Sequence, residues 1–246
     1  MKTIIFTDLD DTLFQTRRKC PDGIELVPAA LDRNGEPHGF QTPTQKRLLK
    51  WLGAATLIPV TGRNPQAFAR VQLRFDSWAV LDHGATLLEP GGTLNLAWRE
   101  RILALLEPQQ AALKEAMKIA DGLNRAYGLG CETRTDLAHD TPFMVVIKHP
   151  QRDNAALSAL AKLWRDHTKS LGLWFFANDN NLSLIAAGVN KEHAVAWLLE
   201  HLQPDLSFGC GDSIADVPFM DKCDFVISPR QSQWLRASLE ANLEQR

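Results

Sequence analysis

Short apolar runs recur along the sequence, and several of them end in polar or acidic residues. The first run, at 3–6, leads into three carboxylates within four positions, namely Asp8, Asp10 and Asp11. An apolar run of this length is typical of a strand buried in a parallel sheet. Similar runs at 56–60, 78–81 and 206–210 lead into Thr61, Asp82 and Asp212. The pattern therefore predicts several parallel strands with polar groups at their carboxyl ends.

Helix signals alternate with these strands. A Thr-Pro-Thr sequence at 42–44 is typical of a helix start, and Gly53 is expected to end that helix. Further helices are predicted to begin near Pro65, at Lys191 and at Gln231. Alternating strands and helices indicate an α/β fold with a Rossmann-like parallel-sheet core. In such a sheet, ligands bind outside the carboxyl ends of the strands, so the polar residues named above should meet there.

A long irregular segment, 15–44, follows the acidic residues. Its stretches 24–30 and 39–41 flank an Asn-Gly pair at 34–35, which is a strong hairpin signal. We therefore expect a hairpin flap beside the acidic turn. The basic run at 17–19 has two open interpretations: it faces an anionic ligand, or it is a solvated turn.

The regular alternation of predicted strands and helices stops after residue 85. A hairpin is predicted from 86–88 and 93–95. After it we expect two helices at 97–106 and 109–123, a strand at 143–148, a helix at 154–171, and two strands at 173–177 and 182–186. This order predicts an inserted α+β domain at 86–187, with the core formed by 1–85 and 188–246. Four side chains of the insertion could meet a substrate, although an exposed structural role is the usual alternative for each: His139, Lys148, His149 and Arg152.

The composition is that of a globular protein and narrows the choice of partner. The 246 residues are 45% hydrophobic and carry a net charge of -2. This balance gives no electrostatic reason to expect nucleic acid or an anionic membrane, and it favours a small ligand. The four cysteines lack CxxC spacing and are expected to be reduced. No apolar run has the length of a signal peptide core or a membrane span, so we expect a cytoplasmic protein.

The clustered acids need an explanation, because carboxylates repel one another in a low-dielectric environment. A divalent hard cation would relieve this repulsion and prefers oxygen ligands. A hydroxyl at Thr61 and a lysine at the first turn of a helix, Lys191, both suit an anion such as phosphate. Each group also has a simpler interpretation: an Asp-rich turn in solvent, a helix cap and a solvated lysine.

Taken in order, four motifs resemble the haloacid dehalogenase superfamily of phosphohydrolases. They are Asp8-Leu9-Asp10-Asp11-Thr12, Thr61-Gly62-Arg63, Lys191 and Gly211-Asp212-Ser213-Ile214-Ala215-Asp216. The position and element order of the insertion are similar to the type IIB cap of that superfamily, which sucrose-phosphate and mannosyl-3-phosphoglycerate phosphatases carry. The chain departs from many type IIB members at Ala215, where they have asparagine, and at Glu192, where they have glycine.

The resemblance implies a role for each acid. Asp8 would be the nucleophile that attacks phosphorus, and Asp10 would be the general acid and base. Mg²⁺ would be held by Asp8, the backbone carbonyl of Asp10 and Asp212, with Asp216 supporting the metal site.

The resemblance also implies a substrate-binding set, consisting of Thr61, Gly62, Arg63 and Lys191. Thr61 and Lys191 would hold the phosphoryl oxygens. The implied activity is Mg²⁺-dependent hydrolysis of a small phosphate monoester, a sugar phosphate or related metabolite, through an aspartyl-phosphate.

Two alternatives remain open in the sequence. A phosphomutase or phosphotransferase of the same superfamily would use the same residues and pass the phosphoryl group to a sugar hydroxyl. A phosphoacceptor signalling domain also uses acids, a threonine, a lysine and Mg²⁺ on a parallel sheet. The second alternative fits less well, because the strand ending at Thr61 offers no acid and the chain is long for such a domain.

Overall fold

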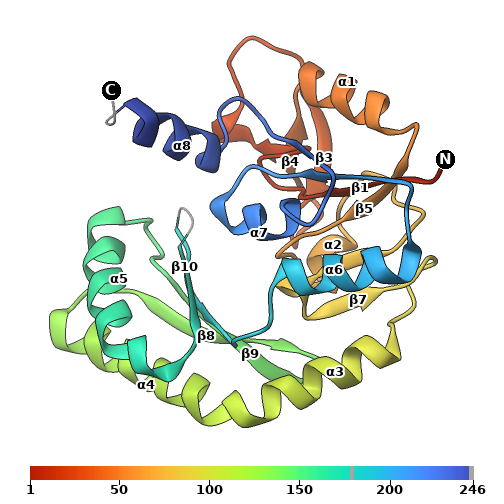
Figure 1. Cartoon of the computed structure of the whole chain (residues 1–246). Helices are drawn as coiled ribbons and strands as arrows, with labels where there is room; N and C mark the ends of the chain where they lie inside the picture. Colours follow the sequence, from red (N-terminus) through yellow and green to blue (C-terminus); the bar gives the residue numbers. More distant parts are fainter. Residues whose placement is uncertain (178–179, 244–246) are drawn as a thin grey trace. The chain divides into compact units, whose positions relative to one another are not determined.

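The computed structural model describes residues 1–177 and 180–243, apart from the side chains of 241–243. The chain divides into two compact units, one formed by Met1–Asn95 and Asn190–Arg246 and the other by Leu96–Val189. In Figure 1 the first unit carries both ends of the colour scale and the second carries its green middle. Among the described helices, none combines the length and the hydropathy of a membrane span.

A parallel four-stranded sheet forms the centre of the first unit. Its order is β13-β12-β1-β5, and the strands are β1 (Thr3–Thr7), β5 (Thr56–Pro59), β12 (Leu206–Cys210) and β13 (Phe225–Ile227). In β1, Ile5 pairs with Phe208 on one side and Leu57 on the other. The apolar run of β1 is buried throughout, as expected for a strand covered on both faces. The predicted parallel α/β core is confirmed.

The described part of the first unit has five α-helices, and side-chain caps begin α1, α2 and α6. They are α1 (Pro43–Leu52), α2 (Pro65–Phe68), α6 (Lys191–Leu202), α7 (Val217–Met220) and α8 (Gln233–Leu243). The hydroxyl of Thr42 accepts a hydrogen bond from the Gln45 amide at 3.2 Å, and the Gln45 side chain accepts one from the Thr42 amide at 3.0 Å. These contacts confirm the predicted helix start, and Gly53 caps its end. The helix near Pro65 is a single turn of four residues.

The flap forms a separate small sheet. Its strands are β2 (Gln15–Thr16), β3 (Val27–Leu31) and β4 (Pro37–Gln41), in the order β2-β4-β3. The predicted hairpin is confirmed by antiparallel pairing of β3 with β4. The carboxylate of Asp32 closes its turn by accepting hydrogen bonds from the amides of Asn34 and Glu36, at 2.8 and 3.0 Å.

The hairpin expected from 86–88 and 93–95 is confirmed: Leu88 bridges Leu94, the Glu89 amide donates to the Thr93 carbonyl at 2.8 Å, and the Asn95 amide donates to the Leu87 carbonyl at 2.9 Å. The strand β7 (Thr86–Leu88) also pairs antiparallel with β6 (Ala79–Leu81), a pairing that was not predicted. It arises from a left-handed turn at η2 (Asp82–Gly84), which reverses the chain immediately after β6. As a result the segment up to residue 95 clusters with the first unit, whereas we had expected the insertion to begin at 86 and to end at 187.

The second unit has α+β architecture, as predicted. Its antiparallel sheet has the order β10-β11-β9-β8, with strands β8 (Glu132–Ala138), β9 (Thr141–Lys148), β10 (Trp174–Ala177) and β11 (Leu182–Ile185). Its helices are α3 (Leu96–Leu106), α4 (Gln110–Tyr127) and α5 (Asn154–Thr168). The strand β8 was not predicted, because its seven residues include few apolar side chains and form no apolar run.

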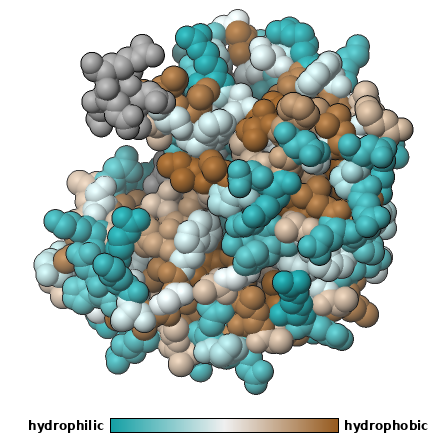
Figure 2. All heavy atoms as spheres, in the orientation of Figure 1, coloured by the Kyte–Doolittle hydropathy of each residue, from teal (hydrophilic) through white to brown (hydrophobic). Residues whose placement is uncertain are grey.

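The surface is mixed in character. On the face drawn in Figure 2, hydrophilic side chains lie between hydrophobic ones. Several large apolar side chains are exposed, including Trp51, Ile214, Phe225 and Leu239. Scattered exposure of this kind is normal for a globular protein.

The core of the second unit provides a test of the fold. Trp164 is fully buried on α5, and its indole N–H donates to the Ala116 carbonyl of α4 at 3.0 Å. Trp164→Ala should lower the free energy of unfolding by about 3–5 kcal/mol, because it leaves a large cavity. Trp174→Ala, at a side chain that is 36% exposed, is the control and should cost much less. Equal losses in urea unfolding would contradict this packing.

Candidate active site

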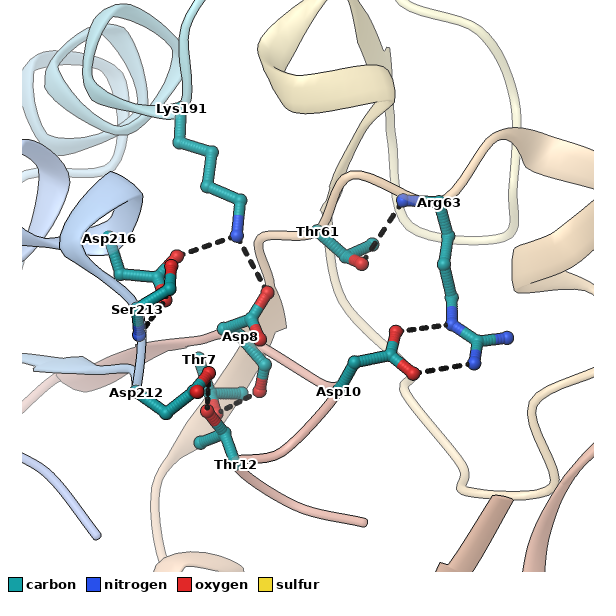
Figure 3. Close-up of polar contacts among 10 residues, drawn as sticks. All are labelled: Thr7, Asp8, Asp10, Thr12, Thr61, Arg63, Lys191, Asp212, Ser213 and Asp216. Carbon is teal, nitrogen blue, oxygen red and sulfur yellow. Dashed lines mark hydrogen bonds and ion pairs between the residues drawn. The ribbon is translucent and has the colours of Figure 1, made fainter. Parts of the chain in front are cut away.

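The topology of the first unit brings the predicted acids together. Asp8 follows β1 and Asp212 follows β12, and these strands are neighbours in the sheet. The amide of Asp8 extends their pairing by donating to the Cys210 carbonyl at 2.8 Å. Lys191 is the first residue of α6. Figure 3 shows Asp8, Lys191, Asp212 and Asp216 gathered on one side of the site, and Asp10 with Arg63 on the other.

A shared lysine forms the centre of the site. The ammonium group of Lys191 donates to Asp8 Oδ1 at 2.6 Å and to Asp216 Oδ1 at 2.7 Å. The three side chains are at most 9% exposed. Burial alone would lower the pKa of Lys191, but the combined effect of the Asp216 and Asp8 carboxylates is larger, so the pKa is raised overall. The lysine is therefore charged, and its carboxylate partners explain its place at a helix start, where a cation opposes the helix dipole.

A capping box fixes the orientation of Asp216. Its second oxygen, Oδ2, accepts hydrogen bonds from the Ser213 amide at 2.9 Å and from the Ser213 hydroxyl at 2.7 Å. Both residues belong to the short helix η5 (Ile214–Asp216) and its cap. We predicted no role for Ser213, although the Ser-x-x-Asp spacing is a helix-start signal that could have identified Ser213 as a capping residue.

The cluster holds more negative charge than one lysine can balance. Burial raises the pKa of Asp8 well above its usual value; Lys191 opposes this rise, and Asp216 and Asp212 add to it. Burial also raises the pKa of Asp212 to about 7, and the nearby carboxylates of Asp216 and Asp11 contribute. These acids are held close together at a cost in electrostatic energy.

The donor set of this cluster fits a divalent cation. Asp8, Asp212 and Asp216 each offer a carboxylate oxygen, and these atoms lie within 4.8 Å of one another. Hard cations such as Mg²⁺ prefer oxygen ligands, and a cation there would offset the excess negative charge. The group includes Asp216, which we had expected only to support the site. A contact of the Asp10 carbonyl with the metal stays a prediction.

Asp10 lies outside the buried cluster and is paired with Arg63. The guanidinium donates to both carboxylate oxygens, from Nε at 2.7 Å and from Nη2 at 2.8 Å. This two-bond geometry is the strongest arrangement of an arginine and a carboxylate. The guanidinium also lies 5.1 Å from the centre of the Phe14 ring. Thus Arg63 contacts the predicted acid and base, and its contact with substrate stays a prediction.

The Thr61 loop is buried beside these groups. Thr61 is 1% exposed, its amide donates to the Val80 carbonyl at 2.9 Å, and its hydroxyl accepts from the Arg63 amide at 3.2 Å. Two threonines for which we predicted no role also contact the acids of the site. Thr7 donates to the Asp8 carbonyl at 2.8 Å, and Thr12 donates to Asp212 at 3.4 Å.

The basic and cap residues considered in the sequence have other surroundings. In the run 17–19, Lys19 pairs with Asp11 next to the site. His139, Lys148, His149 and Arg152 lie in the second unit. Of these, His149 is 8% exposed, and its Nδ1 accepts a hydrogen bond from the Asp153 amide at 3.1 Å. A structural role accounts for His149.

Comparison with solved structures identifies the fold. The sucrose-phosphatase of Synechocystis sp. PCC6803, solved with sucrose and phosphate, has a TM-score of 0.60 at 17% identity, over 97% of this chain and 87% of that one. The C-terminal domain of trehalose-6-phosphate phosphatase from C. albicans has a TM-score of 0.55 at 15% identity, over 89% and 73%. By sequence alone, the chain matches no protein-family model and no curated protein.

A protein from Thermoplasma acidophilum has a TM-score of 0.53 at 16% identity, over 96% of this chain and 89% of that one. These similarities cover nearly the whole chain and include both units. The fold is therefore the one that the four motifs led us to expect: a Rossmann-like core with an α+β insertion, shared with solved sugar-phosphate phosphatases.

The raised pKa of Asp212 predicts how stability varies with pH when metal is removed. A carboxyl whose pKa is higher in the folded than in the unfolded state makes the protein less stable as the pH rises between the two values. In EDTA, the free energy of unfolding should therefore fall as the pH rises from 3.8 to about 7. Saturating Mg²⁺ at pH 8 should restore it, because the cation binds only the folded cluster.

Asp212→Asn is the matched control, since it removes the charge and nearly conserves the volume. Its unfolding free energy in EDTA should depend less on pH, and Mg²⁺ should stabilise it less. The measurement is urea unfolding over a pH series. Identical pH slopes for the wild type and the variant would show that Asp212 is not the titrating group.

Proposed function

We propose that this chain is a Mg²⁺-dependent phosphatase that hydrolyses a small phosphate monoester, a sugar phosphate or related metabolite, through an aspartyl-phosphate. The observation that carries the proposal is the buried carboxylate of Asp8, held 2.6 Å from Lys191 within a cluster of acids that fits a divalent cation. The similarity of the fold to sucrose-phosphatase and trehalose-6-phosphate phosphatase supports it.

Asp8 acts as the nucleophile in this proposal. One carboxylate oxygen attacks phosphorus, the bond to the leaving oxygen breaks, and Asp10 gives its proton to that oxygen. In the second step Asp10 takes a proton from water, the water oxygen attacks phosphorus, and the bond to Asp8 breaks. The products are inorganic phosphate and the free alcohol. The 49% exposure of the Asp10 side chain gives it access to water and to a leaving group.

The remaining residues stabilise charge on the phosphoryl group. Lys191 and Thr61 hold the phosphoryl oxygens as charge spreads over them in the transition state. Bound Mg²⁺ would reduce the repulsion between a carboxylate and a dianionic ester. Asp8, Asp212 and Asp216 would hold that ion. Asp216 and Ser213 also orient Lys191 through the contacts described above.

The second unit acts as a cap that selects the substrate. Each residue with a proposed chemical role lies in the first unit, so the core recognises only the phosphoryl group. The α+β insertion is then the part of the chain that meets the alcohol portion and excludes bulk water.

The direct test is turnover of a panel of phosphate esters by the purified chain with Mg²⁺. We expect release of inorganic phosphate from one or more sugar phosphates, and loss of this release in EDTA. Asp8→Asn, which removes the nucleophile, should lower kcat by at least about 10³-fold. A wild-type chain that releases no phosphate from any ester would refute the proposal. Transfer of phosphate to an added sugar, in place of release, would identify a phosphotransferase.

The role of Asp10 can be separated from that of Asp8 by the leaving group. An aryl phosphate with an acidic phenol needs no proton as it departs, whereas a sugar phosphate does. Asp10→Asn should therefore lose more activity on the sugar phosphate, by about 10²-fold or more relative to the aryl ester. Arg63→Lys keeps the charge beside Asp10 and is the companion variant. An equal loss on both esters for Asp10→Asn would argue against proton transfer by Asp10.

A further inference from the structure

A strained turn lies between the two segments that carry the phosphate-binding residues. Three successive residues of η2 have left-handed backbone angles, with φ of 51° at Asp82, 56° at His83 and 104° at Gly84. Residues other than glycine rarely adopt this region, and two in succession persist only where the surroundings fix them. The Asp82 side chain supplies part of that support, since its Oδ2 accepts a hydrogen bond from the Thr86 hydroxyl at 2.7 Å.

One side of this turn holds the Thr61 loop. The Asp82 amide donates to the Arg63 carbonyl at 2.9 Å, and the His83 amide donates to the Thr61 carbonyl at 3.2 Å. The His83 ring lies so close to Gly62 that a Cβ on Gly62 would be 2.5 Å from it. Two successive amides of the turn are thus directed at the same loop.

The other side of the turn lies against the start of α6. A Cβ on Gly84 would be 2.1 Å from the Asn190 carbonyl oxygen, so only glycine permits this approach. Asn190 is the cap of α6, and its side chain accepts a hydrogen bond from the His193 amide at 2.9 Å. Lys191 follows it directly. The position of Gly84 therefore determines where the helix start, and with it the lysine, can lie.

We propose that the turn Asp82–Gly84 is the positioning element of the site, which sets Thr61 and Lys191 at the separation needed to hold one phosphoryl group. Its three residues act through the segments they contact. The proposal rests on the proposed function for the identity of the ligand. It explains why the chain keeps strained backbone at this point, since a shift of about 1 Å at such groups can cost about 10²-fold in rate.

Gly84→Ala tests the proposal, with Gly92→Ala as the matched control. Both glycines belong to the first unit and have left-handed angles, with φ of 104° and 85°, so alanine strains the backbone at each. Only Gly84 has a neighbour in the way, because a Cβ on Gly92 would meet nothing within 4 Å. Gly84→Ala should lower kcat by about 10²-fold and weaken ground-state binding of the phosphoryl group by a smaller factor, because the displaced groups contact the phosphoryl oxygens in both states and most closely in the transition state. Gly92→Ala should keep wild-type kcat.

A second pair of variants covers the case in which Gly84→Ala does not fold. Asparagine tolerates the left-handed region and keeps an acceptor for Thr86, whereas alanine has neither property. Asp82→Ala should therefore lose about tenfold in kcat, and Asp82→Asn should recover most of it. Equal kcat values for Gly84→Ala and Gly92→Ala, or for the two Asp82 variants, would overturn the proposal while leaving the phosphatase function intact.

Binding of inorganic phosphate with Mg²⁺, measured by calorimetry, separates this proposal from the proposed function. If the wild type hydrolyses no ester but binds phosphate, and Gly84→Ala weakens binding while Gly92→Ala does not, the positioning role holds and the hydrolytic function fails. A wild-type chain that neither hydrolyses esters nor binds phosphate would overturn both.

Discussion

The site depends on one buried ammonium group shared by two carboxylates. Removing a lysine and two aspartates from water is costly, and the cost is recovered only when their geometry is close and their remaining hydrogen bonds are satisfied. Lys191 meets this condition with contacts of 2.6 and 2.7 Å, and Ser213 satisfies the second oxygen of Asp216. The third acid, Asp212, accepts a long hydrogen bond of 3.4 Å from the Thr12 hydroxyl, and burial raises its pKa to about 7. The donor set of these three acids fits a divalent cation.

The parallel sheet makes the arrangement possible. Because β1 lies between β5 and β12, the residues that follow these strands reach the same edge from three distant parts of the sequence. The helix α6 then places the ammonium group of Lys191 beside the acids, although the helix dipole favours an anion at that end. The turn after β6 donates hydrogen bonds to the loop after β5 and packs against the start of α6. Local strain at Asp82 and His83 thus coincides with the candidate active site, and strained backbone is common at such sites.

Much of this could be predicted from the sequence, because the signals were local. The apolar runs, the Thr-Pro helix start and the Asn-Gly turn each correspond to an observed element. The strand β8 was missed because it has no apolar run, and the pairing of β7 with β6 was missed because nothing in Asp82-His83-Gly84 signals a left-handed reversal at non-glycine residues. The acids could be found from their place after strands. Their partners could not, since the pairing of Arg63 with Asp10 depends on side-chain geometry that no spacing rule fixes.

The two leading acids occupy environments that differ as their proposed roles require. Asp8 is almost fully buried, so its carboxylate is held by fixed charges and not by water, which favours attack on phosphorus by a poorly solvated nucleophile. Asp10 is half exposed and is held by a guanidinium through two parallel hydrogen bonds. A group that exchanges protons with a leaving group and with water needs such access, and a buried carboxylate in the Lys191 cluster would not have it. The two residues are separated by a single position in the sequence, and the turn after β1 places one among buried charges and the other at the surface. The spacing Asp8-Leu9-Asp10 therefore gives two neighbouring carboxylates different environments, one buried and one exposed to water, which suits the division of nucleophilic attack and proton transfer that we propose.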